Sequence, residues 1–459
     1  MIQSLHSKAR DQLKNLPGTN KIYDNFDIDF SKGQPTADNI KTHLSATACT
    51  FVPLKGVDRE RDLKFTQALW ETSEYNENAT NVVQPEFAHI ALRPEDSWMA
   101  NSNADRSIYR YFQWLVQEIL VKHGGFDEFS DHLGEPFGIQ VLPSDKKDVQ
   151  YPGMSIDADE GTYDGNAEVI ENLLDQAAVA TEDLESYVEL FHGDLATKEC
   201  IEGLKRMRTI ERTARNRLSF LQFVPGLFHM KMAVADAYAR VHVTPVANRT
   251  EKLGVNKYLN YLRPKATAEF TSKKGPSFRS MHDTIHHVTW TDILASGAIE
   301  AQQLFKFDSL AAFKESKPKW TQLVELSEAI INNHLPGIDF VKKRRSERRD
   351  LVFENMCLRN QHGLLYLGFS RAMNFGDVGH ILQLFHLLIP TFTAVGKHKY
   401  AAHMTKFLTE LDVVYPQELR EAILRNWLFN SKGTPDGFRA FDWLQELNNL
   451  YTKVSFIHK

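Results

Sequence analysis

The N-terminal part of the chain alternates apolar and polar side chains with the period of a β-strand. Residues 21–30 alternate apolar with acidic positions, and residues 43–52 are rich in apolar and β-branched side chains up to Pro53. Ser31 to Pro35 lies between them and contains the Gly and Pro typical of a turn. The pattern predicts a hairpin-like pair of strands, preceded by a short amphipathic helix over residues 1–16.

Two further apolar runs predict a second pair of strands. Residues 187–193 form a continuous apolar run that ends at Asp194 and continues into a helical pattern from Leu195. Residues 218–224 form the next run, which Pro225 and Gly226 interrupt. Short apolar runs bounded by such breaks are typical of buried strands. Another strand is expected within residues 139–156.

Helical spacing dominates the rest of the sequence. Apolar residues recur every three or four positions in parts of 58–135, in 166–178, and through nearly all of 230–453. Segments 263–280 and 430–438 are rich in Pro, Gly, Ser and Lys, which predicts loops. The sequence therefore predicts an α/β protein whose second half is helical.

Composition limits the class of protein. The chain has 459 residues, enough for two or three units or for one core with large insertions. It has no apolar run long enough to span a membrane and no apolar signal-peptide core, so no membrane association is expected. Its three cysteines are far apart, which argues against a disulfide framework and a cysteine zinc site. We expect a nuclear or cytoplasmic protein that is not secreted.

Charge is concentrated in short segments, although the net charge is −5. Such basic segments can bind phosphates, but for any one segment alone a solvated helix face or a nuclear-import signal is the favoured explanation. The candidate DNA-binding residues in the two densest segments are Lys205, Arg206, Arg208 and Arg212, followed by Lys342, Lys343, Arg344 and Arg345. His229 and Lys231, just after the Pro225–Gly226 break, are also candidates for contacting a phosphate.

Asp194 has two possible roles. An acid at the C-terminal end of a central strand occupies the place where α/β sheets often carry their chemistry, and a carboxylate there can bind Mg²⁺. Asp is also a favoured N-cap for the helix that follows. The sequence leaves both roles open.

Acidic residues on predicted strands and helices suggest one type of site. Asp24 lies on the first strand, Asp194 follows a later strand, and Glu354 lies on a helix, with Asp377 as a substitute for the third position. Three such carboxylates could hold two divalent ions about 4 Å apart and cleave a phosphodiester. His282 and His286 have the spacing of a metal pair on a helix, but polar surface histidines are the favoured explanation.

Several phrases are similar to those of a large fungal family of uncharacterised domains, found mainly in mushroom-forming fungi and often in transposon-like genes. They occur in the family's order over nearly the whole chain. The phrases are Ile22-Tyr-Asp24-Asn, residues 44–54, residues 164–170, residues 192–199, residues 223–233, Val352-Phe-Glu-Asn355, residues 376–379, residues 396–402 and residues 426–430.

The layout of this family resembles transposases with a ribonuclease-H-like core. In those enzymes the first acid lies on the first strand, the second follows the fourth strand, and the last lies on a helix beyond a helical insertion. The resemblance implies a metal-binding catalytic triad of Asp24, Asp194 and Glu354, with Mg²⁺ or Mn²⁺ as cofactor and DNA as substrate. It implies core strands in 1–231 with a helical insertion at about 58–135, a second insertion in 232–340, and a helical part in 341–459.

The resulting hypothesis is transposase-like, metal-dependent DNA cleavage and strand transfer by a ribonuclease-H-like domain. DNA binding would be largely non-specific, and a homo-oligomer is possible. A non-catalytic, domesticated remnant that binds nucleic acid or a partner protein is the alternative. The third hypothesis is a helical scaffold in which the acids serve only as helix caps and surface charges. The chain shows no zinc-finger or helix-turn-helix signature, so the hypothesis that it is a fragment of a longer protein also stays open.

Overall fold

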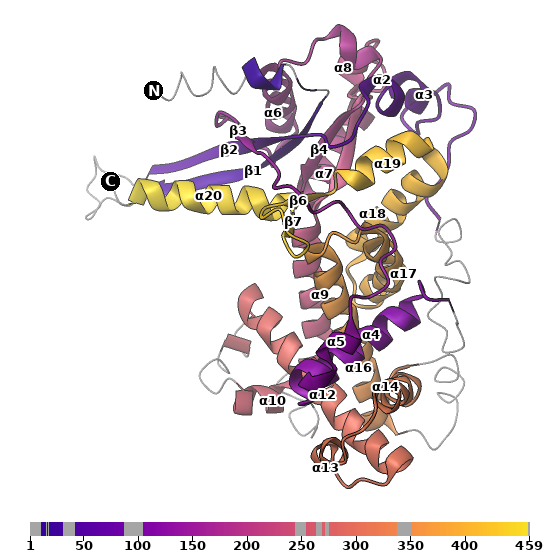
Figure 1. Ribbon diagram of the computed structural model, residues 1–459. Coiled ribbons are helices and arrows are strands. Elements are labelled where there is room, and N and C mark those ends of the chain that lie inside the picture. The colour runs from indigo at the N-terminus through magenta and orange to yellow at the C-terminus, as the bar shows by residue number, and fades with distance from the viewer. Residues whose placement is uncertain are drawn as a thin grey trace.

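The computed structural model describes residues 11–14, 16, 18–30, 42–86, 104–243, 254–262, 269–270, 275–336 and 350–457. Figure 1 shows a sheet at one end of the molecule and a stack of long helices that extends away from it. Most of the helix expected over residues 1–16 lies outside the described residues, as does the turn after Phe30.

A mixed sheet of five strands has the order β3-β2-β1-β4-β5. β1 and β2 pair along their whole length as an antiparallel hairpin, and β4 lies parallel to β1 on one side and to β5 on the other. The strands are β1 (Thr19–Phe30), β2 (Thr42–Pro53), β3 (Tyr151–Pro152), β4 (Glu189–Gly193) and β5 (Leu221–Pro225). The prediction of the hairpin and of two later strands is confirmed, whereas the strand expected within 139–156 is only two residues long.

Helices cover both faces of this sheet. Tyr23 and Phe191 point to one face, where they join a cluster with residues of α6 (Tyr163–Gln176) and α7 (Leu195–Met207). Ile22 points to the opposite face and packs with Phe441 and Leu444 of α20 (Phe441–Ile457). Figure 1 shows α20 running along β1. This alternation follows from the two-residue period of a strand.

The remaining helices lie beside the sheet or in the stack below it (Figure 1), where α9, α12 and α16 contact one another. They are α2 (Arg59–Asp62), α3 (Thr66–Glu71), α4 (Ile108–His123), η3 (Asp127–Phe129), α5 (Ser130–Leu133), η4 (Glu182–Glu185), α8 (Ala214–Arg217), α9 (Leu227–His242), α10 (Val255–Leu262), α12 (Phe278–Phe305), α13 (Leu310–Glu315), α14 (Trp320–His334), α16 (Leu351–Asn374), α17 (Val378–Ala394), α18 (His398–Thr409), the π-helical turn η6 (Glu410–Val414) and α19 (Gln417–Arg425). The helical second half predicted from the sequence is confirmed.

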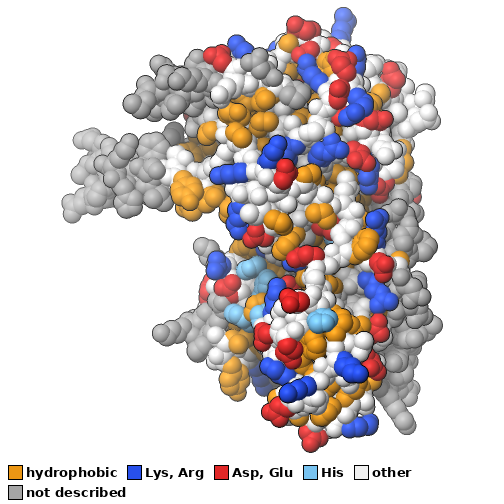
Figure 2. Space-filling model, in the orientation of Figure 1, with side chains coloured by type: hydrophobic (Ala, Val, Ile, Leu, Met, Phe, Trp, Pro, Cys, Tyr) orange, Lys and Arg blue, Asp and Glu red, His pale blue; other side chains and the backbone are white. Residues whose placement is uncertain are grey.

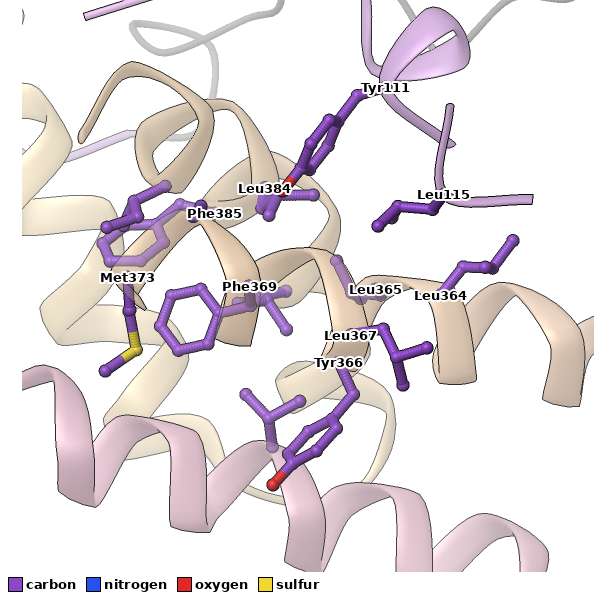
Figure 3. Packing of buried hydrophobic residues seen from close by; sticks show 14 of the residues in the cluster. Tyr111, Leu115, Leu364, Leu365, Tyr366, Leu367, Phe369, Met373, Leu384 and Phe385 are labelled. Atoms are coloured by element: carbon purple, nitrogen blue, oxygen red, sulfur yellow. The ribbon is translucent and has the colours of Figure 1, made fainter. Parts of the chain in front are cut away.

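α16 lies at the centre of the stack and is buried on several sides. Figure 3 shows Leu384 and Phe385 of α17 and Tyr111 of α4 turned toward the apolar residues of α16. The Tyr111 hydroxyl donates a hydrogen bond to the Gly368 carbonyl. Because α16 has no single apolar stripe, its sequence is that of an interior helix.

One β-hairpin interrupts the helical half. β6 (Leu428–Asn430) pairs antiparallel with β7 (Phe438–Ala440), immediately before α20. The loop expected at 430–438 is the connection of this hairpin, but its two short strands were missed. Three-residue strands are too short to show a period in the sequence. In the described part of the chain, no helix is long and apolar enough to cross a membrane.

A buried ion pair ties β1 to β4. Lys21 on β1 is fully buried, and its ammonium contacts the carboxylate of Glu189 on β4. The charges compensate each other where water is excluded, so removing one leaves the other without a partner.

We expect Glu189→Ala to lower the free energy of unfolding by about 3–5 kcal/mol, because it leaves the Lys21 ammonium buried and unpaired. Chemical denaturation measures the change. Lys122→Ala, which removes a surface pair with Glu118 on α4, is the matched control and should cost no more than about 0.5 kcal/mol. Equal effects of the two substitutions would contradict the assignment.

Candidate acidic site

The pairing of β1 with β4 brings two distant aspartates to one end of the sheet. Lys21 pairs with Phe191 and Ile22 with His192, a constant offset of 170 positions (191 − 21). Continued by two residues, the same register sets Asp24 opposite Asp194. Neighbouring strands lie about 4.8 Å apart, so both residues belong to one small region.

Asp194 caps the helix that follows β4. Its carboxylate accepts a hydrogen bond from the Thr197 backbone N–H, with 2.8 Å between Oδ1 and N. The capping role considered from the sequence is therefore confirmed. A cap uses one lone pair, so the carboxylate retains capacity for other contacts.

The last helix brings a third acidic residue beside these two strands. Asp442 in the first turn of α20 is buried and accepts hydrogen bonds from the backbone N–H groups of Phe228 and His229, at 3.1 and 2.8 Å. It thereby caps α9 from a different element. Gly226 permits this approach, because a Cβ at that position would lie 2.6 Å from the Asp442 carboxyl carbon.

Glu446 and Asn449 follow on the same helix. Asn449 donates hydrogen bonds to the Asn25 carbonyl at 3.1 Å and to the Asp24 carboxylate at 3.4 Å. Glu446 is half exposed, and one of its carboxylate oxygens lies 3.7 Å from Nε2 of His229. Glu446 and Asn449, four and seven positions after Asp442, thus share with it a helix face that points toward β1.

Like charges are crowded in this region. Burial, followed by the charge of Glu446, raises the pKa of Asp24 to about 7, with Asp194 adding to the effect and His229 opposing it. Burial, followed by the charges of Asp24 and Asp194, raises the pKa of Glu160 to about 9. Among the described residues, Oε2 of Glu160 is buried without a hydrogen-bond partner.

His229 supplies a positive charge inside this group. Burial alone would lower its pKa, but the hydrogen bond and charge of Asp442, together with Asp194 and Asp24, raise the pKa to about 9. Its Nδ1 lies 3.0 Å from the Asp442 carboxylate. At neutral pH the protonated ring therefore offsets part of the acidic charge. We call Asp24, Glu160, Asp194, His229, Asp442 and Glu446 the acidic site.

Metal coordination is not preassembled in this site. In the portion of the chain that the structure describes, no three His, Cys, Asp or Glu side chains form a group that could hold one metal ion. The oxygen donors nevertheless have the chemistry that hard divalent cations prefer.

The structure does not bring Glu354 to the two aspartates. α12 and α16 are antiparallel, since His282 contacts Tyr366 and Asp292 contacts Arg359. α12 begins at Phe278, which contacts Phe228 next to the acidic site. Glu354 lies twelve residues (366 − 354) before Tyr366 on α16, about 18 Å further from that end at 1.5 Å per residue. The helical acid beside Asp24 is Glu446.

Asp377, the substitute for the third acid, lies at a different helix junction. It caps α17 through the His380 backbone N–H at 3.1 Å and contacts the His380 ring at 2.7 Å. It also accepts hydrogen bonds from the backbone N–H groups of Ile139 and Gln140. Its carboxylate is thus occupied in holding the 139–142 segment against α17.

The candidate phosphate-binding residues have different surroundings. Lys205 donates a hydrogen bond to the Leu221 carbonyl, and Arg206 is exposed beside Glu202. Arg208 donates a hydrogen bond to the Asn216 carbonyl. Arg212 is exposed, and Lys231 lies over the Tyr366 ring. Lys342, Lys343, Arg344 and Arg345 lie outside the described residues. On the face shown in Figure 2, basic and acidic side chains are interspersed.

The sequence contained signals for the residues that were missed. Asp442, Glu446 and Asn449 have helical spacing on the final helix, within the stretch 230–453 that is predicted to be helical from its apolar residues. Glu160 lies in an acidic loop, residues 157–165, which the sequence alone suggests is solvated. The sequence alone does not show that either segment lies close to β1.

A mixed α/β protein with an acidic site at the end of its parallel strands is the class that these observations define. Residues 87–459 match a family described as "Family of unknown function (DUF6589)", and the chain belongs to that family. No curated protein and no solved structure matches the chain.

The pKa values of the acidic site predict how stability depends on pH. Asp24 and Glu160 lose their protons near pH 4 when unfolded but near pH 7 and 9 when folded, so the folded chain binds more protons between these limits. His229, raised from its usual 6.5 to about 9, acts in the same direction. Stability contributed by these groups therefore decreases as the pH rises.

We expect the melting temperature to fall by several degrees from about pH 6 to about pH 9. Asp24→Asn with Glu160→Gln should flatten this dependence, as measured by thermal unfolding across the range. Asp377→Asn is the matched control outside the site and should leave the slope unchanged. A wild-type melting temperature that rises over this interval would count against the charge assignment.

Proposed function

We propose that the protein cleaves DNA phosphodiesters with the help of divalent cations bound at the acidic site. The observation that carries this proposal is the register of β1 with β4, which pairs Ile22 with His192. Asp24 and Asp194 each follow that pair by two residues and so lie near the same end of the parallel strands. The transposase resemblance implies the same layout. In it the first acid lies on the first strand, the second follows the fourth strand, and the last lies on a helix beyond a helical insertion.

Glu446 replaces Glu354 in this proposal. It lies on α20, which packs against β1, and its charge is the largest influence on the Asp24 pKa after burial. Asp24, Asp194 and Glu446 would hold the cation, and Glu160, which interacts electrostatically with Asp24 and Asp194, would contribute a further oxygen. Like-charge crowding and the unpartnered Glu160 oxygen are both features that a bound cation would relieve.

The residues of the chain have separate tasks in such a site. A bound Mg²⁺ or Mn²⁺ would supply Lewis-acid activation of water and stabilise the leaving oxygen. His229, protonated at neutral pH, can donate a hydrogen bond from Nε2 to a phosphate oxygen, while Asp442 fixes its ring through Nδ1. Asn449 orients the Asp24 carboxylate.

A non-catalytic role is the second candidate, and one specific observation favours it. Asp194 and Asp442 both cap helices, and no three ligands in the described chain are placed for one ion. If these acids serve only as helix caps, the protein is a structural domain that binds a nucleic acid or a partner protein. Metal binding by the purified protein separates the two candidates.

We expect Mn²⁺ to bind the purified chain and to support nicking of supercoiled DNA. Asp194→Asn should reduce nicking to the level of a protein-free control without loss of folding, because Asn caps a helix as well as Asp does. Glu446→Gln should do the same, since the side chain is half exposed and Gln has nearly the same shape without the charge. Calorimetry with Mn²⁺ provides a readout that does not depend on activity.

Glu354→Gln is the matched control and should retain wild-type Mn²⁺ binding and nicking. Loss of nicking in that variant alone would restore Glu354 as the third acid. Absence of both Mn²⁺ binding and nicking in the wild-type protein would rule out the enzymatic proposal in favour of the structural one.

A further inference from the structure

A second region with unsatisfied polar groups lies near the C-terminal end of α7, the end opposite Asp194. It is a cavity of about 310 Å³ between the edge strand β5 and the α18–η6 segment, with α3 and α8 forming further walls. This volume is at the lower end of the range of about 300–1,000 Å³ found for small-molecule sites. The size suits one nucleotide-sized ligand rather than a large cofactor.

The walls of the cavity carry three cations, Lys205, Arg217 and Lys406. Lys406 is compensated by ion pairs with Glu74 at 2.7 Å and Glu202 at 3.0 Å. Lys205 has no such ion pair. Its ammonium donates a hydrogen bond to the Leu221 carbonyl at 2.6 Å, and no carboxylate of the described chain lies within ion-pair distance. Burial, followed by the charge of Lys406, lowers the Lys205 pKa to about 8, and the opposing charges of Glu410 and Glu202 only partly offset this.

Two donors in the same wall also lack partners. Among the residues with described surroundings, the Ser219 hydroxyl and Nε of Arg217 are buried without a hydrogen bond. Ser219 is only 9% exposed. Leu218 between them adopts a left-handed conformation with φ of 58°, which is uncommon for a residue with a side chain. Buried donors without acceptors cost free energy unless a ligand satisfies them.

Aromatic rings complete the lining. The Arg217 guanidinium carbon lies 4.3 Å from the centre of the Trp70 ring, and this contact restrains the orientation of the planar group. Tyr75 and Tyr415 also line the cavity. The π-helical turn η6 contributes Glu410, Val413 and Val414, and such turns recur at functional sites.

We propose that this cavity binds the phosphate of a nucleotide-sized ligand, with Lys205, Arg217 and Ser219 as its donors. A planar guanidinium with a free Nε–H, a hydroxyl without an acceptor, and an ammonium that donates only to a backbone carbonyl are donor types that suit phosphate oxygens. A free nucleotide and a nucleotide within a DNA strand share this chemistry. The adjoining aromatic rings would contact the base or the sugar.

The site is separate from the acidic site. Lys205 follows Asp194 by eleven residues (205 − 194) on α7, a separation of about 16 Å at 1.5 Å per residue. Phosphate binding therefore does not depend on the proposed cleavage, and Asp194→Asn should bind the ligand like the wild type.

Calorimetry on the full chain in metal-free buffer tests the proposal with three probes: inorganic phosphate, deoxyadenosine monophosphate and a short single-stranded oligodeoxynucleotide. We expect saturable binding of at least one nucleotide probe, weakened about tenfold or more by Lys205→Met. Ser219→Ala should also weaken binding while leaving the melting temperature equal or higher, because it removes a buried hydroxyl that has no partner.

Arg206→Gln is the matched control, because Arg206 is the next residue of α7 but does not line this cavity. It should bind inorganic phosphate and the monophosphate like the wild type. Binding of the monophosphate identifies a free-nucleotide site, and binding of the oligonucleotide alone identifies a contact with DNA. If no probe binds, or if Lys205→Met and Ser219→Ala bind as tightly as Arg206→Gln, the proposal is wrong.

Discussion

The parallel pairing of β1 with β4 is the contact on which the rest of the site depends. It joins segments separated by 170 positions (191 − 21) and does so with few backbone hydrogen bonds, because β4 is only five residues long. The buried Lys21–Glu189 pair adds an electrostatic restraint between the same two strands. A shift of register by one residue would point Asp24 to the opposite face and leave the Lys21 charge without its partner.

α20 is the second constraint, and it links the end of the chain to its beginning. Its apolar residues Phe441 and Leu444 pack on Ile22, whereas Asp442 caps α9 and Asn449 contacts Asp24. One helix therefore holds the sheet, the start of the helical stack and the acidic site together. The charge of Glu446 remains near Asp24 because the packing of the apolar face fixes the polar face.

The elements of the sheet could be predicted from the sequence, but the third acid could not. The period of residues 21–30 and the breaks at Pro53 and Pro225 are local signals, and each marks a strand or its end. Asp194 could be identified for the same reason, since it directly follows a buried run. Glu446 depends on the packing of α20 against β1, a contact between residues more than 400 positions apart (446 − 24 = 422) that leaves no periodic signal.

Basic residues show the same difference between local and tertiary information. Lys205 and Arg206 are neighbours in one charged run, yet Lys205 turns toward β5 and lines a cavity while Arg206 is exposed. Helix geometry separates neighbours by about 100°, so a run of charge divides between two environments once one face packs. Lys406, about 200 positions later (406 − 205 = 201), completes the cation group on the same cavity. The distribution of charge therefore becomes interpretable only when α7 and α18 are placed together.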